Sequence, residues 1–284
     1  MKFGPFLVFS LLWTILVYNP VCHWVWGAGG SLKTLGVLDF AGGLVVHLAC
    51  GAAALAASLV IGKRKGYGSE NFLPHNLPMT LLGTGLLWFG WFGFNGGSAL
   101  AANATAVGAF VATHLGGMAG MAMWVGVEWV HRGKPTTLGA ASGAVAGLAT
   151  ITPAAGFVGP NAAVIIGGTA GALCYLAVAK KARLGYDDSL DVVGIHGLGG
   201  IIGTLAVGVF ASRAINPDGA DGLLNGSLAL LGAQAIGVLA VGVYVFCISW
   251  ALLALIQKFM GLRVAPDAED QGLDLSEHSE TAYS

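Results

Sequence analysis

The sequence predicts an all-α protein that crosses a membrane several times. Of its 284 residues, 56% are hydrophobic and only 10% are charged, and the mean hydropathy is +0.77. A soluble domain has about a quarter charged residues, so the composition is typical of a membrane protein. The chain also contains 46 glycines, and small residues allow membrane helices to pack at close range.

Long apolar runs divide the chain into eight predicted spanning segments. In order, they cover residues 4–20, 39–62, 75–100, 104–131, 136–154, 160–180, 190–212 and 228–258. The first, with about 17 residues, is short for a span, whereas the last is long enough to tilt or to extend into water. We therefore expect a transmembrane domain at 1–258 and a polar tail at 259–284, whose composition by itself indicates disorder. Asp39 and Asp191 stand at two segment starts and are predicted as N-caps.

Basic residues are distributed unevenly between the loops on the two sides of these segments. If the N-terminus is cytoplasmic, eleven of them lie at the inner ends and only Lys33 and Arg213 lie outside. The eleven are Lys2, Lys63, Arg64, Lys65, Arg132, Lys134, Lys180, Lys181, Arg183, Lys258 and Arg263. The positive-inside rule thus predicts that both termini are cytoplasmic.

Several other classes of function have no support in the sequence. The net charge of -1 carries no signal for nucleic acid. Cys22, Cys50, Cys174 and Cys247 are scattered without a ligand or disulfide spacing. No Gly-Lys-Ser/Thr phosphate loop occurs, no nucleophile–base–acid set indicates an enzyme, and no cofactor is expected. The first residues lack the cleavage site of a signal peptide.

Two histidines inside the apolar segments are the leading site candidates. His47 and His196 each follow a Leu-Asp pair, in segments that cross in opposite directions. Ionisable groups at membrane depth usually face a cavity or a partner, and this arrangement indicates an inverted-repeat transporter with a shared central site. Taken singly, each histidine is equally explained as a buried side chain bonded to backbone. A metal site would require more ligands than these two.

Motifs along the whole chain resemble the ammonium transporter family, in the Amt branch of the Amt/Rh/Mep proteins. They are residues 20–27, 38–47, 88–98, 191–197, 261–264 and 272–278. Members of that family usually have eleven spanning helices in two inverted five-helix repeats plus a final helix. The start at Met1-Lys2-Phe3 resembles a cytoplasmic loop after the family's third helix. The resemblance therefore implies a chain that lacks the first three helices.

The resemblance also implies roles for individual residues. His47 and His196 would lie side by side along a hydrophobic pore that conducts ammonia after ammonium has lost its proton. Trp26 and Ser98 would form an external recruitment site, and Phe94 would be one of two gate phenylalanines, the other lying in a helix that is absent here. Trp24 and Trp91 are assigned to packing.

Further implications concern Asp39, partners and location. The residue at the position of Asp39 supports the family's recruitment site structurally, which agrees with a capping role. We expect a multi-pass protein of the cell membrane (the inner membrane in a bacterium), a homotrimer whose tail contacts neighbouring subunits, and a PII-type signalling protein at the cytoplasmic face. An ammonium sensor and an inactive fragment of a transporter remain as alternatives.

Overall fold

The computed structural model describes residues 1–70 and 72–281, and over these residues it contains helices, turns and loops but no strand. The predicted all-α class is confirmed. The elements are α1 (Phe3–Trp13), η1 (Thr14–Tyr18), α2 (Asn19–Trp26), α3 (Ser31–Thr34), η2 (Gly43–Leu48), α4 (Ala49–Ile61), α5 (Leu77–Gly97), α6 (Ala104–Arg132), α7 (Thr137–Ile151), α8 (Pro160–Leu184), η3 (Val193–Gly197), α9 (Leu198–Phe210), η4 (Leu223–Asn225), α10 (Ala229–Met260), α11 (Pro266–Gln271) and α12 (Leu273–His278).

Seven stretches of helix within the described residues are long and apolar enough to cross a membrane. The fifth predicted segment, 136–154, forms the shorter helix α7, with 15 residues. At about 1.5 Å per residue it is shorter than the roughly 30 Å hydrocarbon core of a bilayer. Helices α5, α6, α8 and α9 pack around α7, and the turns that follow it, at 152–157, are buried in protein. Non-helical backbone is tolerated at membrane depth only under such cover.

The first spanning helix is longer than predicted. The sequence predicts a segment at 4–20, but α1, η1 and α2 follow one another without interruption from Phe3 to Trp26. Pro20 lies in the first turn of α2, directly after the π-helical η1. Proline lacks a backbone N–H, so it is best accommodated where the hydrogen-bond ladder is already altered.

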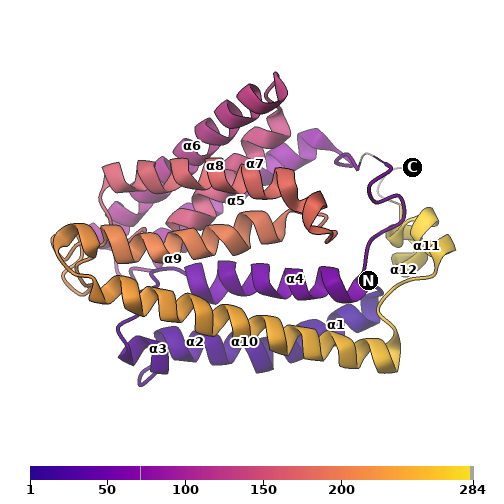
Figure 1. Ribbon diagram of the computed structural model, residues 1–284, viewed down its shortest axis with the longest axis horizontal. Coiled ribbons are helices and arrows are strands. Elements are labelled where there is room, and N and C mark those ends of the chain that lie inside the picture. Colours follow the sequence, from indigo (N-terminus) through magenta and orange to yellow (C-terminus); the bar gives the residue numbers. More distant parts are fainter. Residues whose placement is uncertain (71, 282–284) are drawn as a thin grey trace.

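Two helices form the centre of the molecule. Figure 1 shows α4 and α9 running along the middle, with α10 and α1 on one side and α5 to α8 on the other. The buried Gln234 of α10 contacts the loop before η2 and helix α9. Its amide accepts from the Leu38 N–H at 2.8 Å and donates to the carbonyls of Leu38 and Thr204 at 2.7 and 3.0 Å. The last long helix is thus fixed to both halves of the centre.

Glycines permit the close approach of these two central segments. A Cβ on Gly51 would lie 2.2 Å from the Cα of Gly197, and a Cβ on Gly200 would lie 2.6 Å from the carbonyl oxygen of Gly43. Real Cβ atoms do not reach such distances, so the backbones meet where side chains are absent. This small-residue contact is the geometry expected of membrane helices that pack closely.

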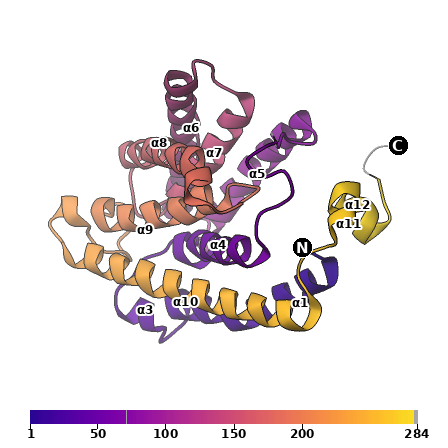
Figure 2. The same cartoon turned by 45° about the vertical axis from the view of Figure 1, so that its right-hand side comes forward.

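The polar tail is ordered, and the expectation of disorder from its composition is wrong for residues 266–278. Glu269 pairs with Arg263 at 2.8 Å and accepts from the Lys65 N–H at 2.7 Å. Glu277 accepts from the Phe3 N–H at 2.7 Å. Figure 2 shows α11 and α12 at the same end of the molecule as the N-terminus. The tail folds because these charges find partners in other segments.

We predict that Gly51→Leu lowers the thermal stability of the protein. Its side chain would enter the backbone of Gly197, and overpacking of this kind costs about 1–3 kcal/mol or more. Thermal unfolding in detergent measures the effect. The matched control is Gly85→Leu on α5, where a Cβ would have no described atom within 4 Å. Equal melting temperatures for the two variants would contradict the proposed packing.

We predict that the tail is released in acid. Contacts with Lys65 N–H and Arg263 lower the pKa of Glu269 below its ordinary value of 4.5. A lowered pKa stabilises docking fully above pH 4.5, and this stabilisation is lost as the pH falls further and Glu269 is protonated. Hydrogen exchange of residues 266–278 between pH 7 and pH 3.5 measures it. Glu269→Gln should expose the tail at neutral pH, whereas Glu280→Gln should not; protection that is independent of pH and of Glu269 would exclude this contact as the anchor.

Candidate functional site

Two buried imidazoles meet at the centre of the fold. The Nδ1 atoms of His47 on η2 and His196 on η3 are 3.1 Å apart, and the ring centroids are separated by 5.2 Å with 22° between the planes. His47 is 3% exposed, and His196 is partly buried. The two residues are 149 positions apart in the chain, so tertiary packing alone brings them together.

Both histidines lie on π-helical segments. The N–H of His47 donates to the carbonyl of Gly42 at 2.9 Å, which is a bond across five residues rather than four. Gly42 itself has φ +120°, a conformation that L-residues with side chains rarely adopt. Single π turns inside helices are found frequently at functional sites, and the extra residue reorients the side chains around it. No feature of the sequence pattern indicates these π turns.

Asp39 caps η2 through both carboxylate oxygens. Its Oδ1 accepts from the N–H groups of Gly42 at 2.9 Å and Gly43 at 2.6 Å, and its Oδ2 accepts from Leu44 at 2.8 Å and Val45 at 3.2 Å. The first N–H groups of a helix have no partner within the helix, and a carboxylate that accepts from them stabilises its start. The predicted capping role of Asp39 is confirmed.

The predicted cap by Asp191 is wrong, because Asp188 occupies that role. Oδ2 of the buried Asp188 accepts from the N–H of Val193 at 2.7 Å. Asp191 instead has φ +58° and forms an ion pair with Lys181. The two capping carboxylates each precede their histidine by eight positions, since 47 − 39 and 196 − 188 are both eight. The second loop contains three aspartates, and sequence reasoning selected the one nearest the apolar run.

An open cavity of about 570 Å³ lies beside the histidine pair. It is lined by Val46, His47, Gly83, Leu86, Leu87, Gly90, Trp91, Phe94 and His196. Apart from the imidazoles and the indole N–H, these side chains are apolar. Trp91 stacks on His47 with centroids 5.5 Å apart and 17° between the planes, while its own Nε1 donates to Thr152 Oγ1 at 2.9 Å. Trp91 was assigned to packing from the sequence, but it also forms part of this wall.

One ring nitrogen of the histidine pair, Nε2 of His47, is buried without a hydrogen-bond partner among the described residues. A buried polar atom without a partner is costly unless a ligand or water satisfies it. No three His, Cys, Asp or Glu side chains gather as a metal site in the part of the chain that the structure describes.

The other predicted site residues occupy two different places. Phe94 lines the cavity, is 43% exposed and meets Trp91 edge-on at 6.1 Å. Ser98 lies one turn further along and donates to the Phe94 carbonyl at 2.8 Å. The indole of Trp26 is 37% exposed and donates to the Asp39 carbonyl at 2.7 Å. Trp26 is thus fixed to the segment that carries His47, but neither it nor Ser98 is among the residues that line the cavity.

A helical fold with close-packed glycines and a polar pair inside an apolar cavity defines a multi-pass membrane protein of the transport class. The chain belongs to the Ammonium Transporter Family, whose model matches residues 1–283. The members of this family are transporters rather than enzymes, and the protein is a multi-pass protein of the cell membrane.

Similar proteins include ammonium transporters of known sequence and structure. The Ammonium transporter of Bacillus subtilis is 50% identical over 284 residues, covering 100% of this chain and 70% of its own length. Ammonium transporter Amt1 of Archaeoglobus fulgidus is 49% identical over 282 residues, covering 99% and 71%. The crystal structure of Saccharomyces cerevisiae Mep2 is 40% identical with a TM-score of 0.88. That match covers 94% of this chain, which spans 62% of the Mep2 chain.

We predict that Asp39→Ala destabilises the protein more than Asp188→Ala. Removal of a helix cap costs about 0.5–2 kcal/mol, and Asp39 satisfies four N–H groups whereas Asp188 satisfies one. Hydrogen exchange should rise at Leu44 and Val45 in the first variant and at Val193 in the second. Asp218→Ala, in a loop far along the chain, is the control. Unchanged exchange at Val193 in Asp188→Ala would restore Asp191 as the candidate cap.

Proposed function

We propose that the protein moves ammonium across the cell membrane as ammonia, past the His47–His196 pair. The single observation that carries this proposal is the pair itself, with Nδ1 atoms 3.1 Å apart beside an apolar cavity. The names of the similar proteins agree with this substrate. Because an apolar lining excludes hydrated ions, ammonium must give up its proton before it passes.

The hydrogen bond between the imidazoles gives the pair its chemistry. If both rings are neutral, one Nδ1 donates and the other accepts, so the two rings hold opposite tautomers. One Nε2 is then an acceptor and the other is a donor. Ammonia can donate to the first and accept from the second, so the pair offers it both kinds of bond in place of water. The free Nε2 of His47 is one of these two positions.

The route to the pair is proposed from the outer side of the protein. Trp26 and Ser98 would recruit ammonium, since a cation is attracted to an indole face and a hydroxyl oxygen accepts one of its protons. Asp39 supports this site by capping η2 and by accepting the Trp26 indole N–H at its carbonyl. Phe94 would gate the entrance, because its ring meets the cavity beside Trp91.

The assembly and regulation of the protein are proposals of the same kind. The distribution of basic residues favours cytoplasmic termini, and the tail 259–284 would then lie on the cytoplasmic face. Three copies in the bilayer, with a PII-type protein bound to that face, would fit the exposed apolar helix surfaces and the ordered tail. A sensor function is the second candidate, because a solved structure named Sensor Amt Protein is 33% identical with a TM-score of 0.81.

We predict that His47→Ala and His196→Ala each lower methylammonium uptake into proteoliposomes by about tenfold, the effect of losing one hydrogen bond of about 1.4 kcal/mol at the rate-limiting point. Both variants should fold, as judged by monodisperse elution. His114→Ala on α6, outside the cavity lining, is the control. Uptake equal to the unaltered protein in both variants would exclude the pair from the pathway. Absence of saturable uptake by the unaltered chain would favour the inactive or sensor alternatives.

A further inference from the structure

The loop before η3 contains a backbone conformation that requires support. Asp191 has φ +58°, in the left-handed region that residues other than Gly, and occasionally Asn or Asp, avoid. Its carbonyl accepts from the N–H of Ile195 at 2.8 Å, one residue before His196. The orientation of the Asp191 peptide therefore sets the starting geometry of the segment that carries the second histidine.

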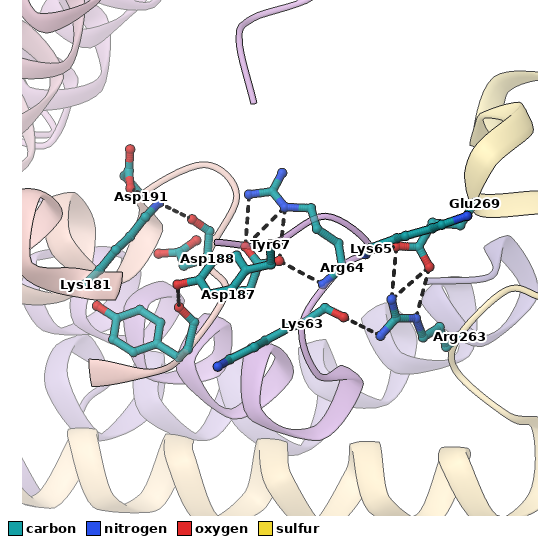
Figure 3. Close-up of polar contacts among 11 residues, drawn as sticks. Lys63, Arg64, Lys65, Tyr67, Lys181, Asp187, Asp188, Asp191, Arg263 and Glu269 are labelled. Atoms are coloured by element: carbon teal, nitrogen blue, oxygen red, sulfur yellow. Dashed lines mark hydrogen bonds and ion pairs between the residues drawn. The ribbon is translucent and has the colours of Figure 1, made fainter. Parts of the chain in front are cut away.

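One ammonium group joins the two ends of this loop. Lys181, near the end of α8, donates from Nζ to the carbonyl oxygen of Asp188 at 2.6 Å and forms an ion pair with the carboxylate of Asp191. Figure 3 shows Lys181 between Asp188 and Asp191. The side chains of Lys181 and Asp191 are only 20% and 26% exposed, so screening by water is weaker than at an open surface.

The same face of α8 continues along η3. Cys174, Val178 and Lys181 are spaced four and three residues apart, which places them on one helix face. Cys174 Sγ lies 3.9 Å from the carbonyl oxygen of Ile195, and a Cβ on Gly194 would lie 2.9 Å from Val178 Cγ2. The π segment is thus pressed against α8 along its length, and Lys181 secures its N-terminal end.

We propose that Lys181 is a positioning residue for His196, because it holds the left-handed turn at Asp191 from which η3 begins. Without the ammonium group, the carbonyl of Asp188 and the carboxylate of Asp191 lose their shared donor, and the turn relaxes toward the common φ region. The shift then passes through the Asp191–Ile195 bond to His196 and breaks the 3.1 Å contact with His47. The inference depends on the proposed function only in treating His196 as a residue of the conduction path.

The adjacent loop adds a second connection to this turn. Arg64 forms a bidentate pair with Asp187, with Nη2 at 2.9 Å and Nε at 3.0 Å, and Tyr67 donates to the carbonyl of Tyr186 at 2.8 Å. These contacts hold residues 186 and 187, whereas Lys181 holds 188 and 191 (Figure 3). Because the two sets of contacts involve different residues of the loop, a substitution of Lys181 removes one set and leaves the contacts of Arg64 and Tyr67 in place.

The test measures the hydrogen bond between the imidazoles directly. In the purified full chain labelled with ¹⁵N-histidine, scalar coupling between the two Nδ1 nuclei reports an N–H···N bond, and its loss in His47→Ala assigns the signal. We expect Lys181→Met to abolish the coupling and Lys181→Arg to retain it. The double variant Lys181→Met/Asp191→Gly should restore it, because glycine adopts positive φ without an ion pair. Lys180→Met, the exposed neighbour, should have no effect.

Each outcome decides the proposal. Full coupling in Lys181→Met would overturn it, and so would a double variant that behaves like Lys181→Met. If Lys181→Met does not fold, the folding and coupling of Lys181→Met/Asp191→Gly decide it instead. The measurement requires no transport, so coupling that follows the expected pattern in a protein without uptake would leave this inference standing while the proposed function fails. If the protein takes up both substrates, the ratio of the methylammonium uptake rate to the ammonium uptake rate should change in Lys181→Met and not in Lys180→Met.

Discussion

The contact between the backbones of Gly51 and Gly197 is the constraint on which the centre of this protein depends. Because a Cβ at Gly51 would fall 2.2 Å from the Cα of Gly197, the two central segments meet without side chains between them. Each histidine lies within about one turn of this contact, on the π-helical segment at or next to it. The imidazoles can therefore bond to each other only because two glycines occupy the crossing. In a membrane, where packing rather than water drives helix association, such small-residue contacts determine geometry.

The two histidine-bearing segments, η2 and η3, begin with the same structural feature. In each of them a carboxylate eight residues before the histidine caps the start of a π-helical segment. Asp39 satisfies four N–H groups, whereas Asp188 satisfies one and is supplemented by Lys181, which joins the Asp188 carbonyl to Asp191. The contacts at the start of η2 therefore come from its own loop, whereas the loop before η3 is also bonded by a side chain of the neighbouring helix α8. Among the described contacts, no lysine side chain bonds to the Asp39 side of η2 as Lys181 does to Asp188 and Asp191 before η3.

Charged residues at the end of the molecule that carries the N-terminus and the tail link its segments to one another. Arg263 binds Glu269 and also donates to the carbonyl of Lys63, and the next residue, Arg64, holds Asp187. A continuous series of contacts thus extends from the tail to the loop before η3. Surface ion pairs are individually weak, but a bidentate arginine and several charges in one network give defined geometry.

The sequence by itself determined the class of the protein and marked His47 and His196 as site candidates, but it predicted eight spanning segments where seven helices of the described residues are long enough to span. Apolar length and the scarcity of charge are local properties, and burial of an ionisable group at membrane depth is unusual enough to mark His47 and His196. Asp39 was also identified, because its cap is formed within six residues. Tertiary structure decided the rest. The stacking of Trp91 on His47 and the order of the tail arise from contacts between distant segments. The π turns, and the cap by Asp188 in place of Asp191, are seen only in the folded structure. Capping by Asp191 is locally as reasonable as capping by Asp188. In the folded protein the Asp191 carboxylate pairs with Lys181 of α8, while the Asp188 carboxylate accepts from the Val193 N–H.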